Sequence, residues 1–124
     1  MQDSETFSLS SRLRSFTYAI NGLLKLVSIE HNAWIHAVAT ICVFGLAWQC
    51  DVSRFEWMIL LIAVAMVWVT EALNTSVEYL ANAVSLEFNP YIKQAKDIAA
   101  GAVLLAALFA TLLGVFVFYP HLFG

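Results

Sequence analysis

The sequence predicts an all-α membrane protein in which three transmembrane helices follow an amphipathic surface helix. Of the 124 residues, 61% are hydrophobic, whereas soluble domains contain about 45 to 50% apolar residues. Charged residues make up 12% of the chain, about half of the usual ~25%. Each crossing of a bilayer needs about 20 helical residues, so three long apolar stretches and their connections account for the chain.

This length fits one domain, residues 1–124, and leaves no room for a large soluble catalytic domain. The formal net charge of −3 gives no general attraction to nucleic acid. We therefore expect no nucleic-acid partner, and an anionic ligand would need a few placed cations. Residues 1–6 contain two acids and no basic stretch before a short apolar core, so we expect no cleaved signal peptide.

The first expected element is the surface helix at residues 9–27. Its apolar residues recur at spacings of three and four, which places them on one helical face. Arg12 and Arg14 fall mostly outside that face, and the segment has no uninterrupted apolar run, so it is expected to lie along the membrane. The two arginines could approach a nucleotide phosphate, but contact with anionic lipid is the commoner explanation.

Three further stretches have the composition of membrane spans: residues 33–49, 57–84 and 98–119. The first lacks Asp, Glu, Lys and Arg, and the second is uncharged up to Thr70 and then carries acids. A polar segment at residues 85–96 precedes the third, and Pro90 is expected to act as a helix breaker there. Most basic residues precede the first span or lie between the second and third, which predicts a cytoplasmic N-terminus.

The second span carries the main functional signal. At about 1.5 Å per residue, Glu71 lies ~21 Å from Trp57 and therefore within the hydrocarbon. At 100° per residue, four polar residues share one helical stripe: Glu71, Asn74, Glu78 and Asn82. An ionisable group at this depth costs at least ~2.5 kcal/mol on insertion scales, and such groups usually mark a site or a pathway.

Ionisable residues of the other helices are expected at the same depth. Glu30 precedes the first span, and Lys96 and Asp97 precede the third. Carboxylates suit a hard cation such as Mg²⁺, a buried glutamate suits a general base, and a lysine suits a phosphate. The set fits phosphoryl transfer from a magnesium nucleotide to a hydroxyl group. Taken singly, most of these residues could instead be solvated helix ends.

Two histidines are weaker candidates. His31 and His36 are five residues apart, and not the four that would place two zinc ligands on one helical face, so a zinc site is not expected. We expect His36 to form a hydrogen bond within the helical bundle.

Two motifs resemble the signature of the prokaryotic diacylglycerol kinase and undecaprenol kinase family. They read Glu71-Ala-Leu-Asn74-Thr-Ser-Val-Glu78 and Ala95-Lys96-Asp97-Ile-Ala-Ala-Gly, with further matches at Ser15-Phe16, Gly22, Glu30, Asn32 and His36. The resemblance covers about residues 12–119 and implies a homotrimer in a bacterial inner membrane. It also implies that the protein uses MgATP to phosphorylate a lipid alcohol at the cytoplasmic interface.

The same resemblance assigns roles to individual residues. It implies Glu71 as the catalytic base, Glu30 and Glu78 as metal ligands, Lys96 as the phosphate ligand, and Asn74 and Asp97 as further polar residues of the site. The family usually has Asp where this chain has Asn82, so one negative charge is absent. If that carboxylate matters, Asn82→Asp should tighten the binding of metal or nucleotide.

The lipid that the resemblance favours is undecaprenol, with diacylglycerol as the alternative. Proteobacterial diacylglycerol kinases tend to carry a serine soon after the Lys-Asp pair, whereas this chain has Ala99 and Ala100. An apolar wall there suits a bare polyprenyl alcohol better than an ester-bearing glycerol head.

Two functions of other classes stay open from the residues alone: a small transporter subunit and a non-catalytic membrane scaffold. A transporter normally has ionisable residues near the bilayer midplane and access from both sides. The outer halves of these spans have no ionisable residue. A scaffold gives no reason for the acid at Glu71.

Overall fold

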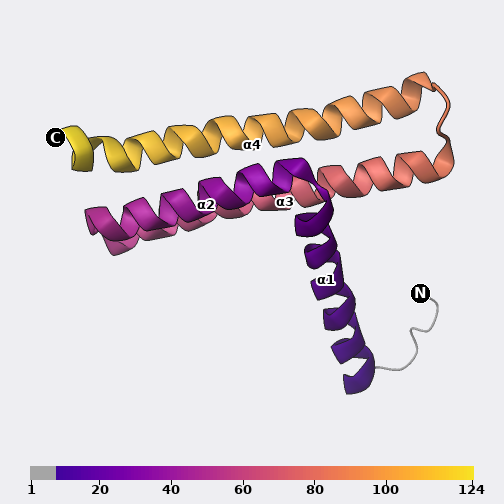
Figure 1. Cartoon of the computed structure of the whole chain (residues 1–124), viewed down its shortest axis with the longest axis horizontal. Helices are drawn as coiled ribbons and strands as arrows, with labels where there is room; N and C mark the ends of the chain where they lie inside the picture. The colour runs from indigo at the N-terminus through magenta and orange to yellow at the C-terminus, as the bar shows by residue number, and fades with distance from the viewer. Residues whose placement is uncertain (1–7) are drawn as a thin grey trace.

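The computed structural model of the protein describes residues 8–124, which form four α-helices. They are α1 (Leu9–Ile29), α2 (His31–Cys50), α3 (Arg54–Val84) and α4 (Pro90–Phe123). Helices α2, α3 and α4 run alongside one another, and α1 projects from them at a steep angle (Figure 1). The expectation about a signal peptide concerns residues 1–6, which lie outside the described part.

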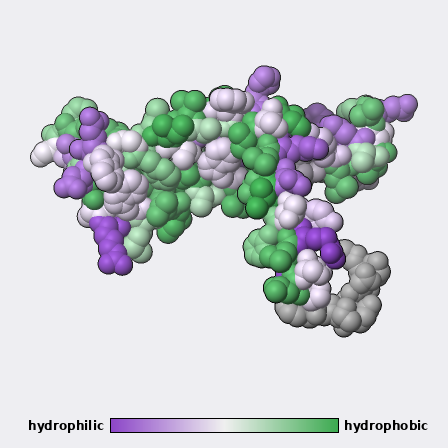
Figure 2. Space-filling model, turned by 60° about the horizontal axis from the view of Figure 1, so that its bottom comes forward, coloured by the Kyte–Doolittle hydropathy of each residue, from purple (hydrophilic) through white to green (hydrophobic). Residues whose placement is uncertain are grey.

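Helices α2, α3 and α4 are each long and apolar enough to cross a membrane. Hydrophobic residues cover the middle of this bundle, and hydrophilic residues gather towards its ends (Figure 2). Helix α1 keeps most of its apolar side chains exposed, among them Leu13, Phe16 and Leu24. The predicted fold class is therefore confirmed, with an N-terminal helix followed by three candidate spans.

Local signals explain where the helices begin and end. A single extended residue, Glu30, separates α1 from α2. Helix α2 ends at Asp51, whose φ of 54° is left-handed and so cannot continue a right-handed helix. Helix α3 starts with a capping box, in which Ser53 and Glu56 each accept a hydrogen bond from the other's backbone N–H.

Helix α4 begins eight residues before the predicted start of the third span. Pro90 does not break a helix here but occupies its first turn, where a missing N–H costs nothing. The side chain of Asn89 caps the helix by accepting hydrogen bonds from the backbone N–H groups of Tyr91 and Ile92. Lys96 and Asp97 consequently lie on a rigid helix and not in a loop.

The C-terminal end of α3 and the N-terminal end of α4 extend beyond the start of α2 as a two-helix hairpin (Figure 1). This hairpin carries the polar segment that links the second and third spans. The candidate site residues of α3 and α4 therefore lie along it or at its junction with α2.

The hydrophobic core lies at the other end of the bundle, around the turn between α2 and α3. It contains Ala47, Val52, Leu60, Val117 and Phe118. At the same end, His121 Nε2 lies 3.0 Å from Glu56 Oε1 and so joins the end of α4 to the start of α3. Because apolar packing and this contact fix the helices at this end, the helices that carry the polar groups at the opposite end have defined relative positions.

We predict that Leu60→Ala destabilises the bundle by about 2 to 5 kcal/mol, since it removes most of a buried side chain from the hydrophobic core. Leu61→Ala is the matched control, because Leu60 is 1% exposed and its neighbour is 52% exposed. Denaturant unfolding in detergent micelles measures both variants. Equal losses in the free energy of unfolding of the two variants would contradict the assignment of Leu60 to the core.

Candidate active site

Glu71 is completely buried between α2 and α3, with 0% of its side chain exposed. Its Oε1 lies 3.2 Å from His36 Nε2, and its Oε2 accepts a longer hydrogen bond of 3.4 Å from the Thr75 hydroxyl. Burying a carboxylate without partners costs several kcal/mol. These two contacts therefore allow an acid to stay inside the bundle.

A second set of contacts fixes the segment of α2 that carries His36. The Thr40 hydroxyl donates to the backbone oxygen of His36 at 2.7 Å and accepts from Trp68 Nε1 at 2.9 Å. The rings of His36 and Trp68 also meet edge to face, with centroids 6.1 Å apart. Trp68 lies one helical turn before Glu71, so α2 and α3 are joined at two adjacent levels.

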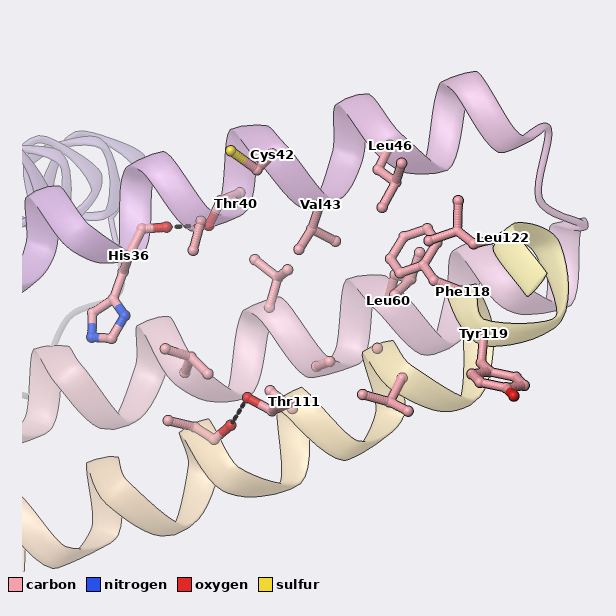
Figure 3. Close-up of a pocket in the computed structure, with 18 of the residues that line it drawn as sticks. His36, Thr40, Cys42, Val43, Leu46, Leu60, Thr111, Phe118, Tyr119 and Leu122 are labelled. Carbon is pink, nitrogen blue, oxygen red and sulfur yellow. Dashed lines mark hydrogen bonds between the residues drawn. The ribbon is translucent and has the colours of Figure 1, made fainter.

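An apolar cavity of about 550 Å³ opens from this junction along the span, between α2, α3 and α4. His36 lies at one end of the cavity, and Leu60, Phe118 and Leu122 lie towards the other (Figure 3). His36 lines the cavity, whereas Glu71 lies behind the imidazole. An elongated apolar space with a polar group at one end is suited to an amphipathic ligand.

Asn74 lies one turn beyond Glu71 on the same stripe and is also buried. Its Oδ1 has no hydrogen-bond partner among the described residues. It lines a smaller cavity of about 400 Å³ between α3 and α4. An unpaired buried acceptor costs about 1–3 kcal/mol, so this oxygen is available to a donor group or a cation of a ligand.

The site residues of α4 form contacts within the hairpin. Lys96 Nζ donates to Asn82 Oδ1 at 2.9 Å, and Lys93 Nζ forms an ion pair with Asp97 at 2.6 Å. Asn82 is uncharged, so it holds the Lys96 ammonium group without neutralising it. The lysine keeps its full charge for an anionic ligand.

The structure does not bring every predicted residue to Glu71. Glu30 is half-buried at the bend between α1 and α2, and Glu78 is exposed on the part of α3 beyond α2. Arg12 and Arg14 lie in the first turns of α1, on the half remote from the other helices (Figure 1). Residues 8–124 contain no cluster of three or more His, Cys, Asp or Glu side chains that could hold a metal.

Sequence reasoning missed three residues that support the buried acid: Thr40, Trp68 and Thr75. Thr75 follows Glu71 by four residues and so lies on the same face of the helix, which is a signal that could have identified it. The contact between Thr40 and Trp68 joins residues 28 positions apart and has no local signal. The expected hydrogen bond of His36 within the bundle is confirmed, and Glu71 is its partner.

The site combines a buried acid at the polar end of an apolar cavity with a charged lysine on the adjoining hairpin. This combination fits the class of membrane-embedded enzymes that act on amphipathic substrates. Residues 17–118 match the family described as prokaryotic diacylglycerol kinase. The chain is also 32% identical to the undecaprenol kinase of Bacillus subtilis, over 92% of this chain and 93% of that protein.

Two diacylglycerol kinases are similar to the chain at the same identity of 32%. The match to the Synechocystis protein covers 89% of this chain but only 63% of that protein. The match to the Helicobacter pylori protein covers 81% of this chain and 78% of that protein. The chain therefore belongs to the prokaryotic diacylglycerol kinase family. The names of the family and of these relatives indicate a lipid kinase, and a kinase implies ATP as the phosphoryl donor.

The contact between Lys96 and Asn82 leads to the opposite expectation for Asn82→Asp from the tighter binding expected above. If Lys96 binds the phosphates of ATP, as the family resemblance implies, the new carboxylate would pair with the Lys96 ammonium and compete with them. Because the pair is exposed, and exposed ion pairs contribute about 0.2 to 1 kcal/mol, we expect the KM for ATP to rise about 1.4- to 5-fold. Steady-state kinetics with Asn82→Ala as the uncharged control measures this effect, and a lower KM in Asn82→Asp would restore the sequence-based expectation.

Proposed function

We propose that this chain transfers the γ-phosphoryl group of ATP to a membrane lipid alcohol, and that undecaprenol is the preferred alcohol. The observation that carries the proposal is the fully buried Glu71 beside His36, at the polar end of an apolar cavity. The name of the Bacillus subtilis relative supports undecaprenol. The names of the other two relatives support diacylglycerol as the second candidate.

In the proposed reaction, Glu71 is the general base. The alcohol oxygen attacks the γ-phosphorus while its proton passes to a carboxylate oxygen of Glu71. The bond from the γ-phosphorus to the bridging oxygen breaks, and ADP leaves. Lys96 balances the charge of the phosphates, while Asn74 and Asp97 contribute polar contacts to the bound nucleotide.

We propose that Glu30 and Glu78 hold Mg²⁺ together with the phosphates of ATP. Mg²⁺ is usually bound by one or two carboxylates, substrate phosphates and water. Two glutamates therefore suffice, and the unpaired Oδ1 of Asn74 adds a further oxygen of the preferred kind. When bound, the ion would neutralise charge on the phosphates.

The apolar cavity is the proposed place for the first part of the lipid tail. It runs along the spans and is lined almost entirely by apolar side chains from α2, α3 and α4 (Figure 3). A tail in this cavity would bring the alcohol group to its polar end, next to His36. The exposed apolar residues of α1 would rest on the membrane surface, where Arg12 and Arg14 contact anionic lipid or nucleotide phosphate.

We further propose that the chain forms one domain over residues 1–124, assembles as a homotrimer, and has a cytoplasmic N-terminus. The distribution of basic residues supports this orientation. The many large apolar side chains left exposed on the spans give lipid and neighbouring copies a surface to contact.

Glu71→Gln is expected to lower turnover by at least about 10²-fold, because the amide keeps the shape of the side chain but cannot accept the proton of the alcohol. Nucleotide binding and helical content should stay close to those of the wild type. Glu56→Gln, at the opposite end of α3, is the control and should not change turnover. A folded Glu71→Gln variant with near-normal turnover would exclude Glu71 as the base.

Glu30→Gln and Glu78→Gln are each expected to raise the Mg²⁺ concentration needed for half-maximal activity, since each removes one anionic oxygen from a hard-cation site. Glu87→Gln, which changes an exposed acid of the loop between α3 and α4, should leave the Mg²⁺ titration unchanged. Unchanged titrations in all three variants would show that the first two acids are solvated helix ends.

For the lipid, we expect a higher kcat/KM for undecaprenol than for diacylglycerol in the same micelles. Without a hydroxyl group near Ala100 to bond the glycerol head, the preference should be worth about 1 kcal/mol, or roughly fivefold. Ala100→Ser should narrow the difference. A wild-type preference for diacylglycerol would overturn the choice of substrate and leave the kinase activity standing.

A further inference from the structure

His36 stands between the buried acid and the apolar cavity. Its side chain is 16% exposed, whereas that of Glu71 is 0% exposed. The imidazole lines the polar end of the cavity (Figure 3). Its Nε2 contacts Glu71 Oε1. An alcohol that enters from the cavity would therefore meet the imidazole first, with the carboxylate of Glu71 directly beyond it.

The proposed role of Glu71 as the base sets the direction of this hydrogen bond. A carboxylate that acts as a base is ionised and can only accept, so in that state His36 Nε2 donates to Glu71 Oε1. The bond leaves Oε2 of Glu71 with a single long contact, to Thr75 at 3.4 Å. Oε2 is therefore the oxygen that is more available to take a proton.

The backbone and ring of His36 are held independently of Glu71. Thr40 bonds the backbone oxygen of His36 and is itself bonded by Trp68. Trp68 also packs against the imidazole edge to face. A side chain fixed on these sides has little freedom to turn away from the acid.

We propose that His36 is the positioning residue of the phosphoryl transfer, because its Nε2–H holds Glu71 Oε1 and thereby fixes the orientation of the carboxylate that takes the proton of the alcohol. This proposal rests on the proposed role of Glu71 as the base. The proton of the alcohol goes to Glu71, and His36 keeps its own proton throughout. A misplacement of about 1 Å in such a group can cost about 10²-fold in rate, so the hydrogen bond acts on turnover more than on binding.

Two neutral amides test this geometry in the complete protein in lipid micelles. In His36→Gln the side-chain nitrogen can reach the position of Nε2, whereas in His36→Asn the side chain is one methylene shorter and its nitrogen reaches only the position of Nδ1. We expect His36→Gln to keep kcat within about fivefold of the wild type. We expect His36→Asn to lose about 10- to 100-fold in kcat, with the KM values for ATP and lipid unchanged in both variants.

Nucleotide binding and far-UV circular dichroism are measured on both variants and on Glu71→Gln. Equal losses of kcat in the two amide variants would overturn the proposal, because a donor at the Nε2 position would then not matter. A loss seen mainly in KM would also overturn it, since that result assigns His36 to binding. If His36→Gln and His36→Asn behave alike while Glu71→Gln is inactive, the positioning role of His36 is excluded but the assignment of Glu71 as the base is retained. Near-normal turnover of Glu71→Gln would remove both assignments.

Discussion

The hydrogen bond between His36 and Glu71 constrains how the helices of the bundle pack against one another. A carboxylate inside a membrane span is tolerated only with a partner, and here the partner comes from a different helix. Helix α2 must therefore pack against α3 at the level of Glu71. The bond between Thr40 and Trp68 fastens the same two helices one turn away, so polar contacts and not apolar area alone define their relative position.

The two ends of the bundle are built on different principles. At the turn between α2 and α3, apolar side chains fill the core and the pair of Glu56 and His121 fastens the helix ends. At the other end α3 and α4 continue alone as a hairpin, and their polar residues are held by single contacts such as that between Lys96 and Asn82. Such an end leaves space for a large polar ligand, while the packed end holds the helices in place.

Much of this arrangement could be predicted from the sequence because it depends on local patterns. The lengths of the apolar stretches predicted the three candidate spans, and the spacing of Glu71 and Asn74 predicted that they share a stripe. The start of α4 was placed too late, because Pro90 and Lys96 suggest a loop until the cap at Asn89 is seen. The pairing of Glu71 with His36 could not be derived, since His36 lies 35 residues away and pairwise packing of helices has no signal in a single sequence.

The bend at Glu30 couples the orientation of α1 to that of α2. Only one extended residue separates α1 from α2, so the connection has very few torsion angles to absorb movement. A change in the tilt of α1 relative to α2 must therefore be absorbed by the backbone at Glu30 and its immediate neighbours, which moves the base of the Glu30 side chain. The orientation of α1 and the position of this acid are thus coupled through a very short connection.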